Sequence, residues 1–360
     1  MQKELDYEFT LQDREAKIQS TNDLHNLEKY GYVSFSGGYD SCVTSELLDY
    51  SLPGNKIPRV YFNTGIEYKE MVDFVKELAK NDDRFIIINS GVNIKKMLEE
   101  NGYPFKSKQH SHNWSMYVNN GEEVNKIIQE LKDNPKKQFD YDFIHNLDRG
   151  TKTIIKYVFG LREKTTKKNK ENKVIYSYLD CPEKLLYQFT NKFKESGLKF
   201  SEKCCYRLKK DIARAYEEQS GRTIAITGMR AEEGGMRAQN GCTIFSEDGK
   251  LKKFHPLKVV SDEWEKEFVK RNNVKICKLY YPPYNFKRTG CVACPYALNI
   301  QEELNRLYKY LPNEYKKALM IWKPVYDEYI RIGYRLKYYP HERGIQLSLE
   351  DFLEEENKGE

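Results

Sequence analysis

The sequence has 360 residues, of which 32% are charged and 39% are hydrophobic, and its formal net charge is +6. This length can bury a sizeable core in one large domain or two medium ones, and the charge suits anionic nucleotides without requiring nucleic acid. No stretch approaches the roughly 18 apolar residues of a membrane span, and the first residues lack the apolar core of a secretory signal. We therefore expect a cytoplasmic protein that does not enter a membrane.

The first predicted unit is a strand, a glycine-rich turn and a helix. Residues 31–35 are typical of a short buried strand, Ser36-Gly37-Gly38-Tyr39-Asp40-Ser41 follows, and a helical stretch continues from Cys42. Glycines let the backbone approach an anion, and the first N–H groups of a helix point at it. An ordinary capped turn is the alternative. The pattern favours a phosphate cradle, with Asp40 available to magnesium or a ribose, and its predicted nucleotide-binding residues are Ser34, Ser36, Gly37, Gly38, Asp40 and Ser41.

Strands and helices alternate in the remainder of the first hundred residues. The predicted strands are 31–35, 58–62, 85–89 and, later in the chain, 223–227, and helical spacing of apolar residues recurs in 47–50, 69–80 and 94–100. This alternation predicts an α/β fold with a doubly wound, mostly parallel sheet. Ligands of such sheets bind at the carboxyl ends of the strands. We therefore expect Ser36, Thr64 and Gly228, which follow three strand ends, to converge.

The middle and the end of the chain have a different pattern. Residues 105–200 are less regular and mostly helical by pattern, which predicts an insertion that covers or flanks the site, and residues 300–356 are typical of a helical tail. The expected organisation is one α/β domain over residues 1–298, followed by a helical extension over 299–360. The basic cluster at 164–170 is more typical of a solvated loop than of a contact with nucleic-acid phosphates.

Four of the eight cysteines form a pattern of two close pairs. Cys204 and Cys205 are adjacent, and Cys291 and Cys294 are separated by two residues. Adjacent cysteines suit the different corners of an iron–sulfur cubane better than one tetrahedral zinc, and four thiolates are the ligand count of a [4Fe–4S] cluster. The pattern therefore favours a [4Fe–4S] cluster over a structural zinc or plain buried thiols.

Arginine and cysteine near residue 230 supply candidate catalytic groups. Arg230 and Arg237 follow the strand that ends at Thr227, and arginine binds oxyanions through two parallel hydrogen bonds. Cys242 follows this cationic segment, where a lowered thiol pKa and a reactive cysteine are the alternative to an ordinary unreactive thiol. We therefore predict nucleotide binding by Arg230 and Arg237, and we count Asp40, Arg230 and Cys242 as catalytic candidates.

Three motifs resemble those of known families. The stretch 36–41 resembles the pyrophosphate loop of the ATP-pyrophosphatase (PP-loop) superfamily, 59–68 resembles the second strand and turn of the phosphoadenosine-phosphosulfate reductase family, and 227–233 resembles that family's G-x-R-x-x-E element. The similarity covers about residues 25–298. It implies an adenine nucleotide alpha-hydrolase-like, Rossmann-like fold, and it adds as nucleotide-binding residues Thr64, Gly65, Glu67 and Gly228.

Two reactions are compatible with this resemblance, since the cysteine pairs also resemble the cluster motif of adenylyl-sulfate reductases and related sulfur-transfer enzymes. A reductase would attack the sulfur of adenylyl sulfate, or of its 3′-phosphorylated form, with a cysteine from an E-C-G-x-H segment, but this sequence has no cysteine after Cys294. The residues therefore favour ATP-dependent sulfur transfer with Mg²⁺. The implied partners are an adenine nucleotide, an electron or sulfur donor protein, and tRNA or DNA as a candidate acceptor; an oligomer and a non-catalytic nucleotide sensor stay open.

Overall fold

The computed structural model describes residues 2–108, 110–112, 115, 122–139, 141–148, 150–152, 155, 161–168, 174–178, 198–233 and 241–342. The chain forms two compact units, each assembled from segments that are distant in the sequence. The first contains Met1–Asn93, Cys205–Ala293 and Arg306–Ala318, and the second contains Ile94–Cys204, Cys294–Asn305 and Leu319–Glu360. The domain boundary expected at residue 298 stays a prediction.

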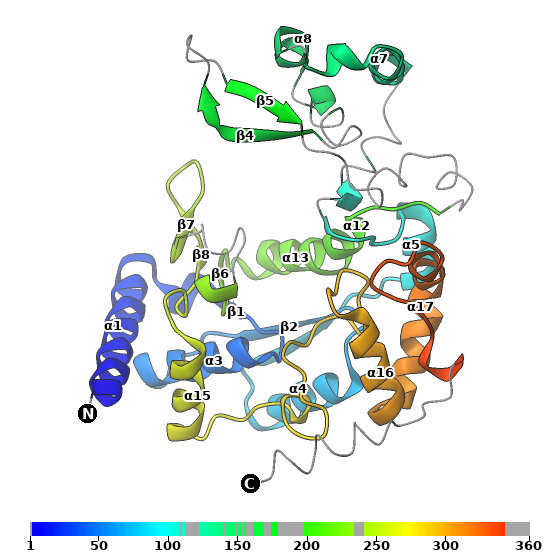
Figure 1. Ribbon diagram of the computed structural model, residues 1–360. Helices are drawn as coiled ribbons and strands as arrows, with labels where there is room; N and C mark the ends of the chain where they lie inside the picture. The colour runs from blue at the N-terminus through cyan, green and yellow to red at the C-terminus, as the bar shows by residue number, and fades with distance from the viewer. Residues whose placement is uncertain are drawn as a thin grey trace. The chain divides into compact units, whose positions relative to one another are not determined.

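A six-stranded sheet forms the centre of the first unit, in the order β3-β2-β1-β6-β8-β7 (Figure 1). Neighbouring strands from β3 to β8 pair in parallel, and β7 pairs antiparallel with β8. The predicted α/β fold with a mostly parallel sheet is therefore confirmed, whereas β7 and β8 were not predicted. The strands are β1 Gly31–Ser34, β2 Arg59–Asn63, β3 Phe85–Asn89, β6 Ile224–Ile226, β7 Thr243–Phe245 and β8 Leu251–Phe254.

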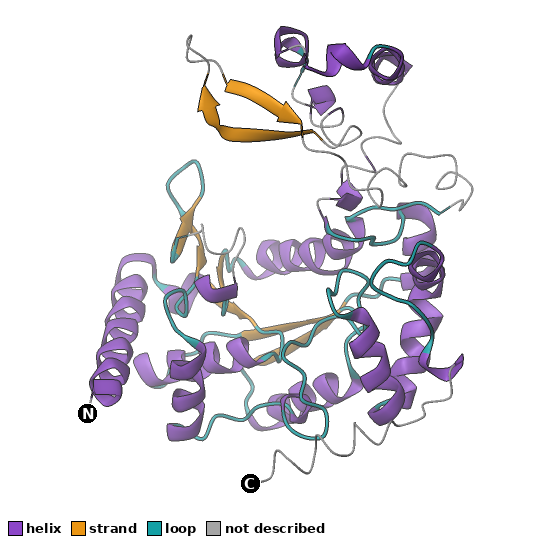
Figure 2. Ribbon diagram, viewed as in Figure 1, coloured by secondary structure: helices purple, strands orange, loops and turns teal. Residues whose placement is uncertain are grey.

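Helices cover both faces of this sheet because side chains alternate along each strand. Val33 and Ile226 are buried in the larger core, which also includes side chains of α1, α3, α4 and α15. Their neighbours Tyr32 and Ala225 belong to a smaller cluster, against which Tyr216 of α13 packs. Figure 2 shows these helices in purple around the orange sheet. The helices are α1 Gln2–His25, α2 Leu27–Tyr30, α3 Tyr39–Ser51, α4 Lys69–Asn81, α13 Asp211–Ser220 and α15 Asp262–Arg271.

The strand order places a topological switch point between β1 and β6. From β1 the chain proceeds to β2 and then β3 on one side, and β6 pairs with the other side of β1. Crevices at such points, beyond the carboxyl ends of the strands, are the ligand sites of open α/β sheets. The loop that follows β1 and the loop that follows β6 therefore flank one such crevice.

The second unit contains helices and one hairpin. In its middle part lie α5 Ile94–Asn101, α7 Glu122–Asp133, the 3-10 turn Pro135–Phe139 and α8 Tyr141–Asn146. The antiparallel hairpin of β4 Leu161–Lys168 and β5 Val174–Tyr178 was not expected in a segment predicted to be mostly helical. A solvated loop was predicted for 164–170, but residues 164–168 belong to strand β4. β-Branched residues such as Thr165 and Thr166 favour a strand.

Short turns and the helical tail complete the described chain. The helical tail predicted for 300–356 is confirmed as far as Arg331 by α16 Ile300–Tyr310 and α17 Pro312–Arg331, on which Leu304, Leu307 and Trp322 are buried. Residues 332–339 form turns and irregular structure, and the part of the predicted tail after residue 342 lies outside the described residues. No helix within the described ranges is both long enough and apolar enough to cross a membrane. The remaining elements are α12 Lys203–Cys205, the π-helical turn η3 Tyr206–Lys210, η4 Ala231–Glu233, η5 Lys278–Tyr280 and η6 Pro340–Glu342.

Candidate nucleotide-binding site

The loop between β1 and α3 is held in shape by its own polar groups. The Ser41 hydroxyl donates to the Gly38 carbonyl over 2.7 Å, and the Ser36 and Gly38 N–H groups donate to the Ser41 and Ser36 hydroxyls, each over 3.3 Å. Gly37 has a φ of +72°, and a Cβ there would lie 2.3 Å from the Met71 sulfur. Glycine is therefore required at this position, as the phosphate-cradle prediction assumed.

A cavity of about 360 Å³ opens over this loop, and we call it the loop cavity. It lies at the N-terminus of α3, whose first N–H groups and dipole favour an anion. Lys287 and Arg288 add two cations to its lining. The predicted residues that line it are Ser34, Ser36, Gly38, Asp40, Ser41 and Gly228.

Gly228 allows the chain after β6 to pack closely against the loop between β1 and α3. A Cβ at this position would lie 2.5 Å from the Asp40 carbonyl oxygen and 2.7 Å from its carbonyl carbon. The backbone after β6 therefore packs directly on the first turn of α3, which fixes Thr227 at the edge of the loop cavity. This contact explains the convergence that the sequence predicted for Ser36 and Gly228.

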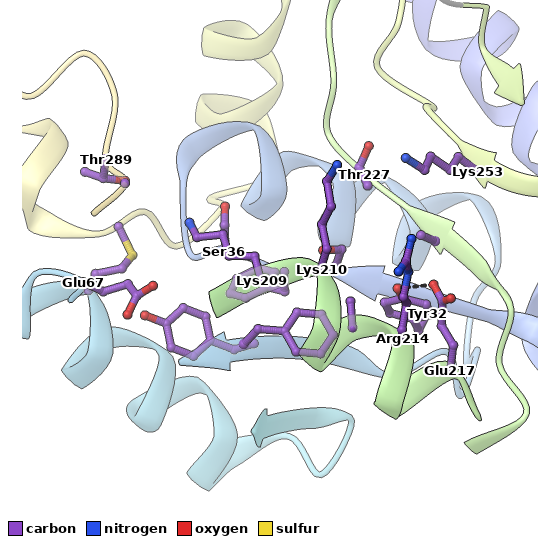
Figure 3. A pocket seen from close by; sticks show the side chains of 18 residues that line it. Tyr32, Ser36, Glu67, Lys209, Lys210, Arg214, Glu217, Thr227, Lys253 and Thr289 are labelled. Carbon is purple, nitrogen blue, oxygen red and sulfur yellow. Dashed lines mark hydrogen bonds between the residues drawn. The ribbon is translucent and has the colours of Figure 1, made fainter. Parts of the chain in front are cut away.

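A second cavity of about 460 Å³ adjoins the first, and we call it the sheet cavity (Figure 3). The residues that line both cavities are Ser34, Ser36, Thr227 and Thr289. Tyr32 and Phe62 contribute aromatic rings whose centroids are 6.3 Å apart. In Figure 3 the side chains of Lys210 and Lys253 extend toward Thr227 from η3 and β8. The sheet cavity thus combines an apolar, aromatic wall with cations.

The turn after β2 is shaped by Glu67. Its carboxylate accepts the N–H groups of Thr64 and Gly65 over 3.0 and 3.1 Å, and the Thr64 hydroxyl over 2.6 Å. Glu67 lines the sheet cavity, whereas Thr64 and Gly65 are not among the residues that line either cavity. Their role in nucleotide binding stays a prediction, and the contacts show that the three residues form one self-bonded turn.

Arg230 is engaged by carboxylates. Its guanidinium lies 3.3 Å from oxygens of Asp40, Glu232 and Glu265, and 2.5 Å from one of Asp262. Burial lowers its pKa, but the carboxylates, with Glu265 first, raise it above its ordinary value. Arg230 does not line either cavity, so the geometry assigns it the task of joining α3, the loop after β6 and α15. Its predicted contact with an oxyanion stays a prediction.

The pKa of the Cys242 thiol is raised, whereas the catalytic role predicted from the sequence would need it to be lowered. Burial raises the pKa of its thiol, although Arg14 and Lys17 act to lower it. The thiol donates to the His255 carbonyl over 3.2 Å. The expectation of a lowered pKa is therefore wrong, because burial outweighs the nearby cations. Arg237, the other member of that cationic segment, lies outside the described residues.

The four cysteines of the predicted cluster occupy two short segments. Cys205 and Cys291 belong to the first unit, and Cys204 and Cys294 to the second. Ala293 has a φ of +43°, so the chain turns sharply between Cys291 and Cys294. Within the described ranges no three His, Cys, Asp or Glu side chains gather at a site that could hold a metal ion.

Several residues of the two cavities were missed by sequence reasoning. Lys209, Lys210 and Arg288 line these cavities, although the sequence analysis singled out only Arg230 and Arg237 for oxyanion contacts. The available signal was the run Lys287-Arg288-Thr289, which only Gly290 separates from the second cysteine pair. The residues that were missed include Thr227, Tyr280, Lys287, Thr289, Arg214 and Lys253.

The fold and the site define an α/β protein with a glycine-containing loop and two adjoining cavities at the switch point of its sheet. A family model described as "Phosphoadenosine phosphosulfate reductase domain" matches residues 31–175 and 150–297, which is more than half of the chain. The chain therefore belongs to the phosphoadenosine phosphosulfate reductase family.

Two known proteins are similar to parts of the chain. An uncharacterized protein of Methanocaldococcus jannaschii is 36% identical over 74 residues, a match that covers 21% of this chain and 18% of that protein. The second is the crystal structure of phosphoadenylyl-sulfate reductase from Candida auris, a phosphate complex. The structural match covers 72% of this chain and 79% of the reductase chain. Its sequence identity is 12% and its TM-score is 0.34.

Proposed function

We propose that the protein binds an adenine nucleotide with its phosphates in the loop cavity and its adenosine in the sheet cavity. The observation that carries the proposal is that the two cavities adjoin and share Ser36 and Thr227 at the switch point. The α3 N-terminus, Lys287 and Arg288 supply the positive field that phosphates need. Tyr32 and Phe62 supply the apolar surface that suits a base.

We propose that the reaction is ATP-dependent sulfur transfer. In this reaction the loop cavity would hold the ATP phosphates with a magnesium ion, for which Asp40 is the lining carboxylate. An acceptor oxygen would attack the α-phosphorus and release pyrophosphate, and sulfur would then replace the adenylated oxygen and release AMP. A donor protein would supply the sulfur, with tRNA or DNA as candidate acceptor, in the cytoplasm, where thiols stay reduced.

We further propose that Cys204, Cys205, Cys291 and Cys294 hold a [4Fe–4S] cluster. The support is the donor set alone, because four thiolates are the ligand number of such a cluster, whereas no three of these side chains gather within the described ranges. Lys209 and Lys210 lie shortly after the first pair, Gly290 directly precedes the second, and all three line the sheet cavity. A cluster held by these four cysteines would supply electron or sulfur relay.

Reduction of adenylyl sulfate, or of its 3′-phosphorylated form, is a second candidate. The observation that favours it, besides family membership, is the cationic edge of the sheet cavity, where Lys209, Lys210 and Arg214 can hold a sulfate. In that reaction the cations would hold the sulfonate group of the substrate while a thiol attacks its sulfur, with AMP or its 3′-phosphate as the leaving group. A thiol of the electron-donor protein would then attack the sulfur of the modified cysteine, forming a disulfide and releasing sulfite.

One incubation separates these reactions. The anaerobically purified protein is supplied with a dithiol reductant and with ATP or adenylyl sulfate, and pyrophosphate, AMP and sulfite are measured. Pyrophosphate from ATP supports adenylation, sulfite supports reduction, and binding without any product favours a nucleotide sensor. Absence of binding to both compounds contradicts the proposal. D40N should lower ATP affinity with magnesium present, and D73N, which changes an exposed carboxylate on α4, is the matched control.

The cluster has its own test in iron and labile sulfide analysis. We expect equal amounts of iron and sulfide, with C291S and C205S losing both. C277S is the matched control, because Cys277 is a buried thiol outside the two pairs. One equivalent of zinc without sulfide would overturn the cluster.

A further inference from the structure

Thr227 and His255 are direct neighbours at the carboxyl ends of two parallel strands. Ile226 of β6 is paired with Phe254 of β8. Thr227 and His255, which directly follow these two residues, therefore lie side by side. The Thr227 N–H donates to the Phe254 carbonyl over 3.0 Å, and the His255 N–H donates to the Cys242 carbonyl over 2.7 Å. Both backbones are therefore fixed by the sheet.

The two side chains form a hydrogen bond at the junction of the cavities. The Thr227 hydroxyl oxygen lies 2.7 Å from Nδ1 of His255. Thr227 lines both cavities, whereas His255 is 2% exposed and lies behind it. The imidazole therefore contacts the threonine that faces the ligand without reaching the ligand space itself.

The buried imidazole is neutral near pH 7. Burial lowers the pKa of His255 to about 4, with Lys253 and Lys258 acting in the same direction and a hydrogen bond with the Thr227 backbone opposing them. A neutral imidazole carries one proton, either on Nδ1 or on Nε2. The position of that proton decides whether the Thr227 hydroxyl accepts from the ring or donates to it.

The surroundings of Nε2 decide between the two tautomers. Nε2 is buried, and none of the described residues offers it a hydrogen-bond partner. A proton on Nε2 would therefore be an unsatisfied buried donor, which is rarer in proteins than an unsatisfied acceptor. The proton on Nδ1, in contrast, has the Thr227 oxygen as its acceptor.

We propose that His255 is a positioning residue whose Nδ1–H donates to Thr227, so that the Thr227 hydroxyl proton is directed at an anionic oxygen bound where the two cavities meet. This assignment deepens the proposed nucleotide site, on which it rests. Thr227 would then donate to the nucleotide, and His255 would fix the direction of that donation without contacting the nucleotide. The close packing of Gly228 on Asp40 keeps the pair beside the loop.

The first test is a double-mutant cycle on affinity for ATP and adenylyl sulfate. T227V and H255L should each weaken binding by about tenfold, and the double variant should be no weaker than either, because both changes remove the same directed donor. T227S retains the hydroxyl and H255N retains a donor near Nδ1, so both should stay within about twofold. Additive losses, or an H255N variant as weak as H255L, would overturn the assignment.

The second test does not depend on nucleotide binding. Nitrogen NMR of the wild-type protein reports which ring nitrogen of each of the 6 histidines carries the proton, and the H255N spectrum identifies the His255 signals. A proton on Nδ1 supports the assignment even if neither nucleotide binds, in which case only the proposed function fails. A proton on Nε2 contradicts the assignment whatever the binding result.

Discussion

Gly228 shows how a single residue can determine the shape of the loop cavity. Alanine there would bring a methyl group 2.5 Å from the Asp40 carbonyl oxygen, and backbone cannot yield as the end of a side chain can. We expect G228A to lower the free energy of unfolding by about 1–3 kcal/mol and to weaken ATP binding as α3 shifts. Chemical denaturation and calorimetric titration measure the two effects.

The matched control for this change is G290A. Gly290 lines the sheet cavity, and a Cβ there would meet nothing within 4 Å. We expect its stability to change by no more than about 0.5 kcal/mol. Equal effects of G228A and G290A would show that the contact between β6 and α3 does not limit the residue size at position 228.

Glu265 gives the protein a pH-dependent stability. Burial, assisted by Asp40, raises its pKa from 4.5 to about 8, while Arg230 opposes the rise. Between these values the folded protein holds a proton that the unfolded chain has released, so the free energy of unfolding falls as the pH rises through this window. E265Q should flatten this dependence and be more stable than the wild type above pH 8, as measured by denaturation across pH. If the free energy of unfolding of E265Q changed with pH as steeply as that of the wild type, Glu265 would not be the source of this dependence.

The sequence predicted the role of a residue correctly when the groups that contact it are close to it in the sequence. The hydrogen bonds of Ser36 and Ser41 lie within this six-residue loop, so its motif predicted its shape, although the Tyr39 N–H also donates to the distant Tyr280 hydroxyl. Arg230 was assigned to an anion because Asp262 and Glu265, more than thirty residues later in the chain, gave no local signal. Cys242 was misjudged for the same reason, since burial depends on distant chain segments.

At the scale of elements, the strands with strongly apolar sequences were predictable. β1, β2, β3 and β6 have nearly continuous apolar residues, which is typical of strands covered on both faces. β7 and β8 are three and four residues long, and β8 has two exposed lysines between its buried ends. Such short segments are distinguished from loops by pairing with distant strands, which the sequence alone does not show.

Helix α15 attaches α1 to the core through Trp264. The indole stacks on Tyr7 at 5.4 Å and on Phe268 at 5.0 Å, and its N–H donates to the Tyr7 carbonyl over 3.1 Å. We expect W264A to lower the free energy of unfolding by about 3–5 kcal/mol, and W264F to cost less because it retains most of the apolar area. Denaturant titration measures both. Equal losses would show that the hydrogen bond, and not the buried ring, contributes most.

At the scale of the whole molecule, alternation of strands and helices sufficed to predict the class of fold. The doubly wound sheet and the convergence of Ser36 with Gly228 follow from the order of β1, β2 and β6, because parallel strands need crossover helices. The composition of the two units was not predictable, since each joins three separate chain segments. No local pattern shows that Arg306–Ala318 belongs with the first of them.

Nucleotide binding should therefore change amide exchange in the first unit. At an ATP concentration about 100-fold above Kd, binding raises the free energy of unfolding by about 2.7 kcal/mol. We expect slower exchange in the loop after β1, in the loop after β6 and in the run Lys287–Gly290, because these segments line the two cavities. Hairpin β4–β5, which belongs to the second unit, serves as the internal reference. Protection confined to the hairpin and α7 would place the nucleotide elsewhere and contradict the assignment of both cavities.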